Sequence, residues 1–97
     1  MAFALIARWV ARDGEQEAVL AALGALAEPS RAEPGCLQWE AHRDLDDHRA
    51  FVLYERYRDR EAYEAHLASA HFERYARGDA LDRLERRERQ MLEPLGL

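Results

Sequence analysis

Apolar and polar residues follow two different repeats along this chain, and the first stretch to stand out covers residues 3–10. This run is almost wholly apolar, is too short for a typical helix and is followed by Arg12, Asp13 and Gly14. These features predict a largely buried strand. Alternation along it places one apolar set on each face: Phe3, Leu5 and Trp9, and Ala4, Ile6 and Val10. Other parts of the structure must therefore shield the apolar side chains on both faces of this strand from water.

A helical repeat follows the first strand. Asp13 is suited to cap the start of a helix, and Gln16 three residues later completes a pattern like a capping box. Apolar residues then recur at helical spacing, at Val19, Leu23 and Leu26. Because Pro29 would interrupt a helix, we expect this one to span about residues 14 to 28 or slightly beyond.

Two strand patterns come next, one on either side of a polar loop. Residues 33–35 have the composition of a turn, and apolar and polar residues alternate over 37–42. Residues 50–57 are rich in aromatic and other β-forming side chains. The polar residues 43–49 between them predict an antiparallel hairpin.

A symmetrical hairpin would pair Trp39 with Tyr54 on one face and Glu40 with Leu53 on the other, although a slip of one residue would exchange the faces. Trp39 and Tyr54 could then line a pocket for a flat aromatic ligand, but such cross-strand pairs are more often core packing.

Charged residues also occur within these half-buried strands, at Glu40, Glu55 and Arg56. They indicate either ion pairs across a subunit interface or a polar pocket, and we favour the interface.

The last third of the chain predicts a helix and a strand. Asp59 can cap the helix, Gly78 can end it, and its buried stripe would consist of Ala62, Tyr63, His66 and Leu67. We expect this helix over about residues 60 to 77. Residues 79–92 fit a helical turn in part and strand alternation in part, and we interpret them as the final strand.

The resulting order, β-α-β-β-α-β, predicts one α+β domain over residues 1–97 with the ferredoxin-like split βαβ fold. In that fold an antiparallel sheet carries both helices on one face. The other face here also carries apolar side chains, so we expect a homodimer that packs sheet against sheet.

Composition narrows the function classes. The formal net charge of −5 has the wrong sign for binding nucleic acid or anionic lipid, so neither is an expected partner. The apolar start carries Arg8 and is far shorter than the roughly 20 residues that cross a bilayer, so we expect no export signal or membrane anchor. Cys36 is the only cysteine, which excludes an internal disulfide and fits the cytoplasm.

The common cofactor motifs are absent from the sequence. It contains no glycine-rich phosphate loop, Walker lysine, nucleophile elbow or two-cysteine zinc knuckle. Every basic residue other than histidine is an arginine, which excludes a lysine Schiff base. We therefore expect no cofactor.

The chemistry that remains lies in His66 and His71, on a mainly apolar helical segment beside Tyr63, Phe72 and Tyr75. Imidazole titrates near neutral pH, so either histidine could move a proton. On an ideal helix the two side chains would point about 140° apart and could not share a metal, unless the helix breaks near Ser69. We expect no metal site. Both histidines could instead be structural.

Three motifs make the chain resemble the antibiotic biosynthesis monooxygenase family. They are Glu33-Pro34-Gly35-Cys36, Tyr54-Glu55-Arg56-Tyr57, and Ala65-His66-Leu67 continuing to His71-Phe72. The resemblance covers almost the whole chain. It implies the ferredoxin-like fold and a dimer in which two sheets face each other as an α+β barrel.

The resemblance also implies an activity. Oxygenases of this family oxidise quinols, anthrones and similar polycyclic phenols with dioxygen, using neither metal nor flavin. On that pattern His66 or His71 would be the catalytic base, and the other histidine or Arg56 would stabilise the substrate anion. Trp39, Tyr54 and Phe72 would hold the aromatic rings.

Other activities occur among proteins that share this resemblance. The haem-degrading branch requires an Asn, a Trp and a haem-ligating His at positions that are Ala7, His66 and Ala76 here, so haem degradation is not expected. An isomerase acting on a small phosphorylated compound would require basic residues in the pocket. A non-catalytic dimeric ligand-binding or stress-associated protein is the third alternative.

Overall fold

The computed structural model describes all 97 residues and confirms the predicted order of elements. They are β1 (Phe3–Ala11), α1 (Gln16–Arg31), β2 (Cys36–Arg43), β3 (Ala50–Tyr57), α2 (Arg60–Leu67), the π-helix η1 (Phe72–Arg77), the 3₁₀-helix η2 (Ala80–Arg83) and β4 (Leu84–Leu92). The predicted second helix is thus divided in two, and the final strand begins at Leu84 after a short helical turn. None of the helices is long and apolar enough to cross a bilayer.

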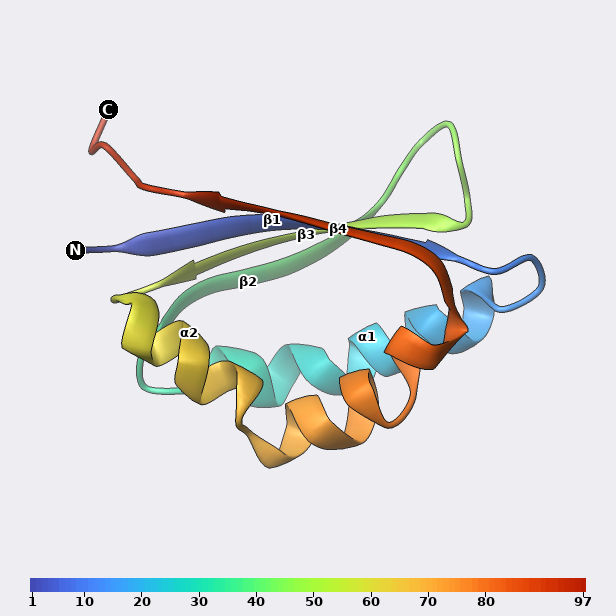
Figure 1. Cartoon of the computed structure of the whole chain (residues 1–97), viewed down its shortest axis with the longest axis horizontal. Helices are drawn as coiled ribbons and strands as arrows, with labels where there is room; N and C mark the ends of the chain where they lie inside the picture. The colour runs from blue at the N-terminus through green and yellow to red at the C-terminus, as the bar shows by residue number, and fades with distance from the viewer.

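The four strands form one antiparallel sheet in the order β2-β3-β1-β4. All the helices lie on one side of this sheet, and the loop between β2 and β3 rises on the other side (Figure 1). This is the predicted α+β, ferredoxin-like arrangement, in which the central strand β1 pairs with both β3 and β4. We refer below to the helix-covered face and the open face of the sheet.

The core fills the space between the helix-covered face and the helices. Strand β1 contributes Phe3, Leu5 and Trp9 to it, as the sequence predicts. Fully burying side chains of this size contributes about 1.5–3 kcal/mol each to folding. From the other layer, α1 contributes Val19, Ala22, Leu23 and Leu26.

The predicted register of the hairpin is wrong by one residue. Trp39 pairs with Glu55, and Glu40 pairs with Tyr54. The loop does not close symmetrically, because the backbone N–H of Asp44 donates to the carbonyl of Ala50 at 2.9 Å. Trp39 and Glu55 therefore lie on the helix-covered face, whereas Glu40 and Tyr54 lie on the open face.

The start of α1 also differs from the prediction. Asp13 is exposed and does not cap the helix, which begins at Gln16 after Glu15, a residue whose side chain makes no capping hydrogen bond. The end agrees with the prediction, since α1 continues slightly beyond residue 28, through Pro29 to Arg31. A proline removes only one backbone donor, and this one lies in the last turn, where the loss is small.

In α2 the predicted cap is confirmed. The backbone N–H of Ala62 donates to the Asp59 carboxylate at 2.9 Å, and this bond holds the pKa of Asp59 below its usual range. The helix ends at Leu67, and the hydroxyl of Ser69 then donates to the carbonyl of His66 at 2.6 Å. The same hydroxyl accepts from the N–H of Phe72, so Ser69 satisfies backbone groups on both sides of the break.

Gly35 is the point where the turn before β2 meets α2. It is buried, and a Cβ at this position would overlap the methyl group of Ala62. Its carbonyl also accepts from the N–H of Arg58 at 2.8 Å. Only a residue without a side chain allows this approach, which explains the glycine of the Glu-Pro-Gly-Cys motif.

We therefore expect Gly35→Ala to destabilise the protein by about 1–3 kcal/mol, because the added methyl group overpacks the contact. Combining it with Ala62→Gly should cost less than the sum of the two single changes. Gly24→Ala is the control, since α1 has open space there, and it should stabilise the helix by about 0.5–1 kcal/mol. Urea denaturation of Gly35→Ala, Ala62→Gly, the double variant and Gly24→Ala, each compared with wild type, would measure these changes in stability. Additive costs at Gly35 and Ala62 would contradict the close contact.

Candidate active site

His66 and His71 converge on one carboxylate, that of Glu33. The Nδ1 atom of His66 lies 2.7 Å from Glu33 Oε2, and the Nε2 atom of His71 lies 2.5 Å from the same oxygen. The expectation that these side chains point apart is wrong, because the helix breaks at Ala68 and Ser69 and resumes with a different repeat. The break turns His71 back toward His66.

Glu33 reaches this position from the turn after α1. The side chain is mostly buried, with 15% of it exposed. The N–H of Cys36 donates to the backbone carbonyl of Glu33 at 3.0 Å, which fixes the turn. The sequence predicts only a turn at Glu33. Its place in the Glu-Pro-Gly-Cys motif was the available signal for a further role.

On its other side, His66 faces a second carboxyl group. Its Nε2 atom lies 3.7 Å from Glu55 Oε1, and Glu55 accepts a hydrogen bond of 2.6 Å from the hydroxyl of Tyr57. Burial raises the pKa of Glu55. The pKa of Tyr57 is also raised, by burial and by the neighbouring Glu55 carboxylate. Glu55 therefore lines a polar pocket inside the chain, and the favoured assignment to an interface ion pair is wrong for this residue.

A small cavity lies between the sheet and the second helical segment. Leu5, Trp9, Leu67 and Phe72 supply most of its apolar wall, and Glu55 and His66 lie at its polar side. Its volume is about 10 Å³, the space of roughly one water molecule. Pockets for drug-sized ligands are typically about 300–1,000 Å³, so a ring system enters only if α2 and η1 move away from the sheet.

Hydrogen-bond donors line the same cavity. The indole N–H of Trp9 is buried and has no partner, which is costly unless a ligand or water accepts from it. Arg87 and Arg89 reach the cavity from β4, and Arg89 Nη1 donates to the hydroxyl of Tyr63 at 2.9 Å. Burial, with the neighbouring Arg89, lowers the pKa of Arg87. The cavity thus combines donors for a negatively charged oxygen with an imidazole that can accept a proton.

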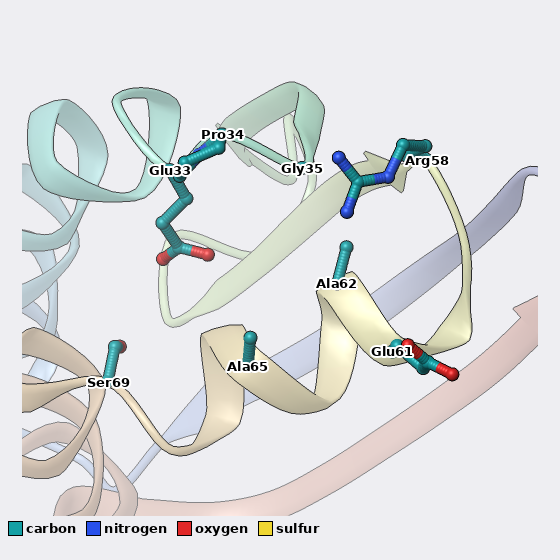
Figure 2. A pocket seen from close by; sticks show the side chains of 8 residues that line it. All are labelled: Glu33, Pro34, Gly35, Arg58, Glu61, Ala62, Ala65 and Ser69. Atoms are coloured by element: carbon teal, nitrogen blue, oxygen red, sulfur yellow. The ribbon is translucent and has the colours of Figure 1, made fainter.

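A separate groove lies on the outside, between the turn after α1 and α2 (Figure 2). Its volume is about 340 Å³. Figure 2 shows the Glu33 carboxylate pointing from the turn toward the helix, across from Ala65 and Ser69. Glu61 and Arg58 lie at the opposite end of the groove. Glu33 is thus in contact with His66 and also borders solvent.

The sequence profile that describes the family "Antibiotic biosynthesis monooxygenase" matches residues 2–78. The chain belongs to this family. A curated relative, "Putative monooxygenase Rv0793" of Mycobacterium tuberculosis, is 39% identical over 72 residues, which are 74% of this chain and 70% of the relative.

Solved structures of the family agree with this assignment. The structure of Rv0793 superposes with a TM-score of 0.91 at 35% identity, covering 98% of this chain and 96% of that one. The crystal structure of PA3566 from Pseudomonas aeruginosa superposes with a TM-score of 0.90 at 39% identity, covering 97% and 94%. Family and fold, both predicted from the sequence, are confirmed.

The remaining predicted site residues of this family member are not brought together within one chain. Phe72 lines the cavity. Trp39 is buried away from it, where Arg31 Nε donates to its backbone carbonyl at 2.9 Å. Tyr54 and Arg56 belong to the open face, because they alternate with Glu55 along β3. They lie across the sheet from His66, so Arg56 cannot reach an anion in the cavity of its own chain.

Glu33, His66 and His71 are also the residues that could hold a metal, since their ligand atoms lie within 4.8 Å of one another. Two ligands of a tetrahedral ion bound at about 2.1 Å would be about 3.4 Å apart. The observed separations of 2.7 and 2.5 Å are those of hydrogen bonds instead. Cys36 is no better suited to bind metal, because burial and the nearby Glu33 raise its pKa to about 11.

The raised pKa of Glu55 makes a prediction about stability. Folding favours the protonated carboxyl, so the wild-type protein loses stability as pH rises from the unfolded pKa, about 4.3, through the higher folded pKa. Glu55→Gln keeps an acceptor for Tyr57 but cannot ionise. We expect its stability relative to wild type to increase from about pH 4 to about pH 8.

Urea midpoints across this pH range would measure the effect. Three other groups influence the Glu55 carboxyl, namely His66, Glu33 and Arg87, and all three are retained in the variant. Glu64→Gln, at an exposed site on α2, is the control and should show no such trend. A Glu55→Gln difference that is constant with pH would show that the carboxyl ionises normally.

Proposed function

We propose that this protein is a cofactor-independent monooxygenase that oxidises a quinol, an anthrone or a similar polycyclic phenol with dioxygen. Membership of the monooxygenase family supports the reaction class. The observation that carries the proposal is His66, which lies on the wall of the largely apolar cavity with its Nδ1 atom 2.7 Å from Glu33.

The contact with Glu33 sets the tautomer of His66. A carboxylate only accepts hydrogen bonds, so the Nδ1 atom carries the proton and donates it to Glu33. The Nε2 atom, toward the cavity and Glu55, is then free to accept a proton from a phenol. His66 is the base in this mechanism. His71 is the helper and acts through Glu33, since it does not line the cavity.

Loss of the proton makes the phenol an electron-rich anion, and dioxygen takes an electron from it. The negative oxygen formed in this step needs donors in a place without water. Trp9 and Arg89 supply them from the cavity wall. The stabilising role expected for Arg56 therefore passes to residues of β1 and β4.

Entry of the substrate requires the cavity to open. The break at Ser69 and the following π-helix are the places where the second helical segment can change shape, and π-helical turns occur frequently at functional sites. Closure after entry would exclude water from the anion.

Arg87 and Arg89 also support a second candidate, an isomerase acting on a small anionic compound. Both line the cavity, which is the basic cluster that such an enzyme requires. It would need no dioxygen, so turnover under nitrogen distinguishes the two activities.

We also propose that the protein works as a homodimer through the open face of the sheet. Ile6 is 37% exposed there, and Val52 and Tyr54 beside it are half-buried. Pairing two such faces would remove this apolar surface from water and place polar residues such as Glu40 and Arg56 opposite a partner.

Oxygen uptake by metal-free protein with a panel of quinols and anthrones would test the proposed reaction. Trp9→Phe removes the unpartnered donor and should lower kcat/KM by about 100-fold, as removal of one oxyanion donor does elsewhere. Trp39→Phe is the matched control, because Trp39 is equally buried, has an unpartnered N–H and lies outside the cavity. No uptake above the buffer rate across the panel, or an equal loss in both variants, would count against the proposal.

Sedimentation equilibrium would test the dimer. We expect wild type to be dimeric and Ile6→Arg to raise the dissociation constant at least tenfold, because burying one unpaired charge costs more than about 1.4 kcal/mol. Leu20→Arg, at a 45% exposed site on α1, should leave association unchanged. A monomeric wild type at about 100 μM would refute this arrangement, since obligate interfaces persist far below that concentration.

A further inference from the structure

We propose that Glu33, held in place by His71, forms a route by which the proton taken up by His66 leaves the cavity for water in the surface groove, and returns by the same path. The inference rests on the proposed function for its role in turnover. The geometry of the route does not depend on which substrate is used.

The cavity and the groove have no lining residue in common. His66 borders the cavity, Glu33 borders the groove, and the 2.7 Å contact between them joins the two spaces. Only 3% of the His66 side chain is exposed, so its ring has no direct path to bulk water. A proton on this ring therefore reaches solvent through a neighbouring side chain.

Glu33 is the neighbour that can pass the proton on. The other candidate, Glu55, lies 3.7 Å from His66, which is too long for a hydrogen bond. Its carboxyl accepts its hydrogen bond from Tyr57, which is fully buried, and no further polar group continues outward from that hydroxyl. Glu33 and His71, in contrast, are 15% and 18% exposed. The route to solvent thus begins at the Nδ1 side of His66.

Each proton transfer along this route breaks one bond and forms another. The phenol O–H bond breaks and an N–H bond forms at Nε2 of His66; the Nδ1–H bond then breaks and an O–H bond forms on Glu33. The proton passes from Glu33 to groove water, with His71 holding the carboxylate in place at 2.5 Å. Dioxygen is the oxidant. One oxygen atom enters the ring as a carbonyl, and the other leaves as water with the two hydrogens that the substrate loses.

The charged groups around Glu33 are consistent with this role. Besides the two imidazoles, Arg58 and Glu61 line the same groove, and neither makes a hydrogen bond to Glu33. The thiol of Cys36 lies on the sheet side of the turn and stays protonated, because its pKa is raised. Glu61 is therefore a matched control, a carboxylate of the same groove that has no contact with His66 or His71.

Exchange of the His66 ring N–H with water, followed by ¹⁵N NMR of the full chain without substrate, tests the route directly. Glu33→Gln keeps the size of the side chain and an acceptor for Nδ1–H, but it cannot take up a proton. We expect it to slow exchange by about tenfold or more, by analogy with the loss of a positioned acid or base. Glu61→Gln should leave the exchange rate unchanged.

A second measurement uses turnover of an anthrone, 1,8-dihydroxyanthrone. Glu33→Ala should lose most of its oxygen uptake, and added formate should restore part of it, which a purely structural role would not allow. Should the Glu33 variants not fold, His71→Asn provides the test, and it should slow exchange because the carboxylate is no longer held in place.

Unchanged exchange in Glu33→Gln, or equal slowing in Glu61→Gln, would overturn the inference. The inference would also be overturned if formate restored no oxygen uptake to a correctly folded Glu33→Ala variant. If wild type consumes no oxygen with any substrate but Glu33→Gln still slows exchange, the route is supported and the proposed reaction is the part that fails.

Discussion

Glu33 accepts hydrogen bonds from two imidazoles, and through them it holds together three segments that are distant in the sequence. They are the turn after α1, the end of α2 and the start of η1. Leaving a buried partner of such a bond unpaired costs about 1–3 kcal/mol. Together with the close approach of Gly35 and Ala62, this contact positions α2 over the sheet and places His66 at the cavity.

The same contact separates two environments. On one side His66 faces a cavity lined by buried Glu55 and by Arg87 and Arg89 of β4, and on the other it meets a carboxylate at the edge of solvent. Buried charged groups weaken a fold unless they are paired, and carboxyl groups with raised pKa values cluster at functional sites. The polar side of this cavity is therefore better explained by chemistry than by stability.

Relatives with TM-scores of 0.90 and above share the fold over nearly their whole length. A fold of this kind carries many activities, so the chemistry depends on the side chains inside it. In this chain these side chains include an unpartnered indole donor at Trp9, two arginines on β4 and the Glu33 cluster. The open face of the sheet, with Tyr54 and Arg56, is the surface that we propose pairs with a second subunit.

The sequence alone determined the order of the elements, the two faces of β1, the cap at Asp59 and the family. Each of these depends on local patterns, such as alternation, turn residues and motif spacing, that can be recognised within a few residues. Local patterns also led to two wrong predictions. Asp13 is a residue type that caps helices, but it lies too far before the start of α1. A symmetrical loop at residues 43–49 was the simplest way to close the hairpin, but the hydrogen bonds that form close it differently.

Only the tertiary structure decided how the site is assembled. Ideal helical spacing separates His66 from His71, and nothing local indicated that Ser69 would satisfy backbone groups on both sides of a break. Glu33 lies more than thirty residues earlier in the chain, and its contact with both histidines exists only because α1 and the segment from α2 to η1 lie on the same face of the sheet (Figure 1). The one-residue change in register places Glu55 on the helix-covered face and Tyr54 on the open face. It likewise depends on how the loop between β2 and β3 closes. Sequence patterns therefore named the two histidines, and long-range packing supplied the carboxylate that gives them a common role.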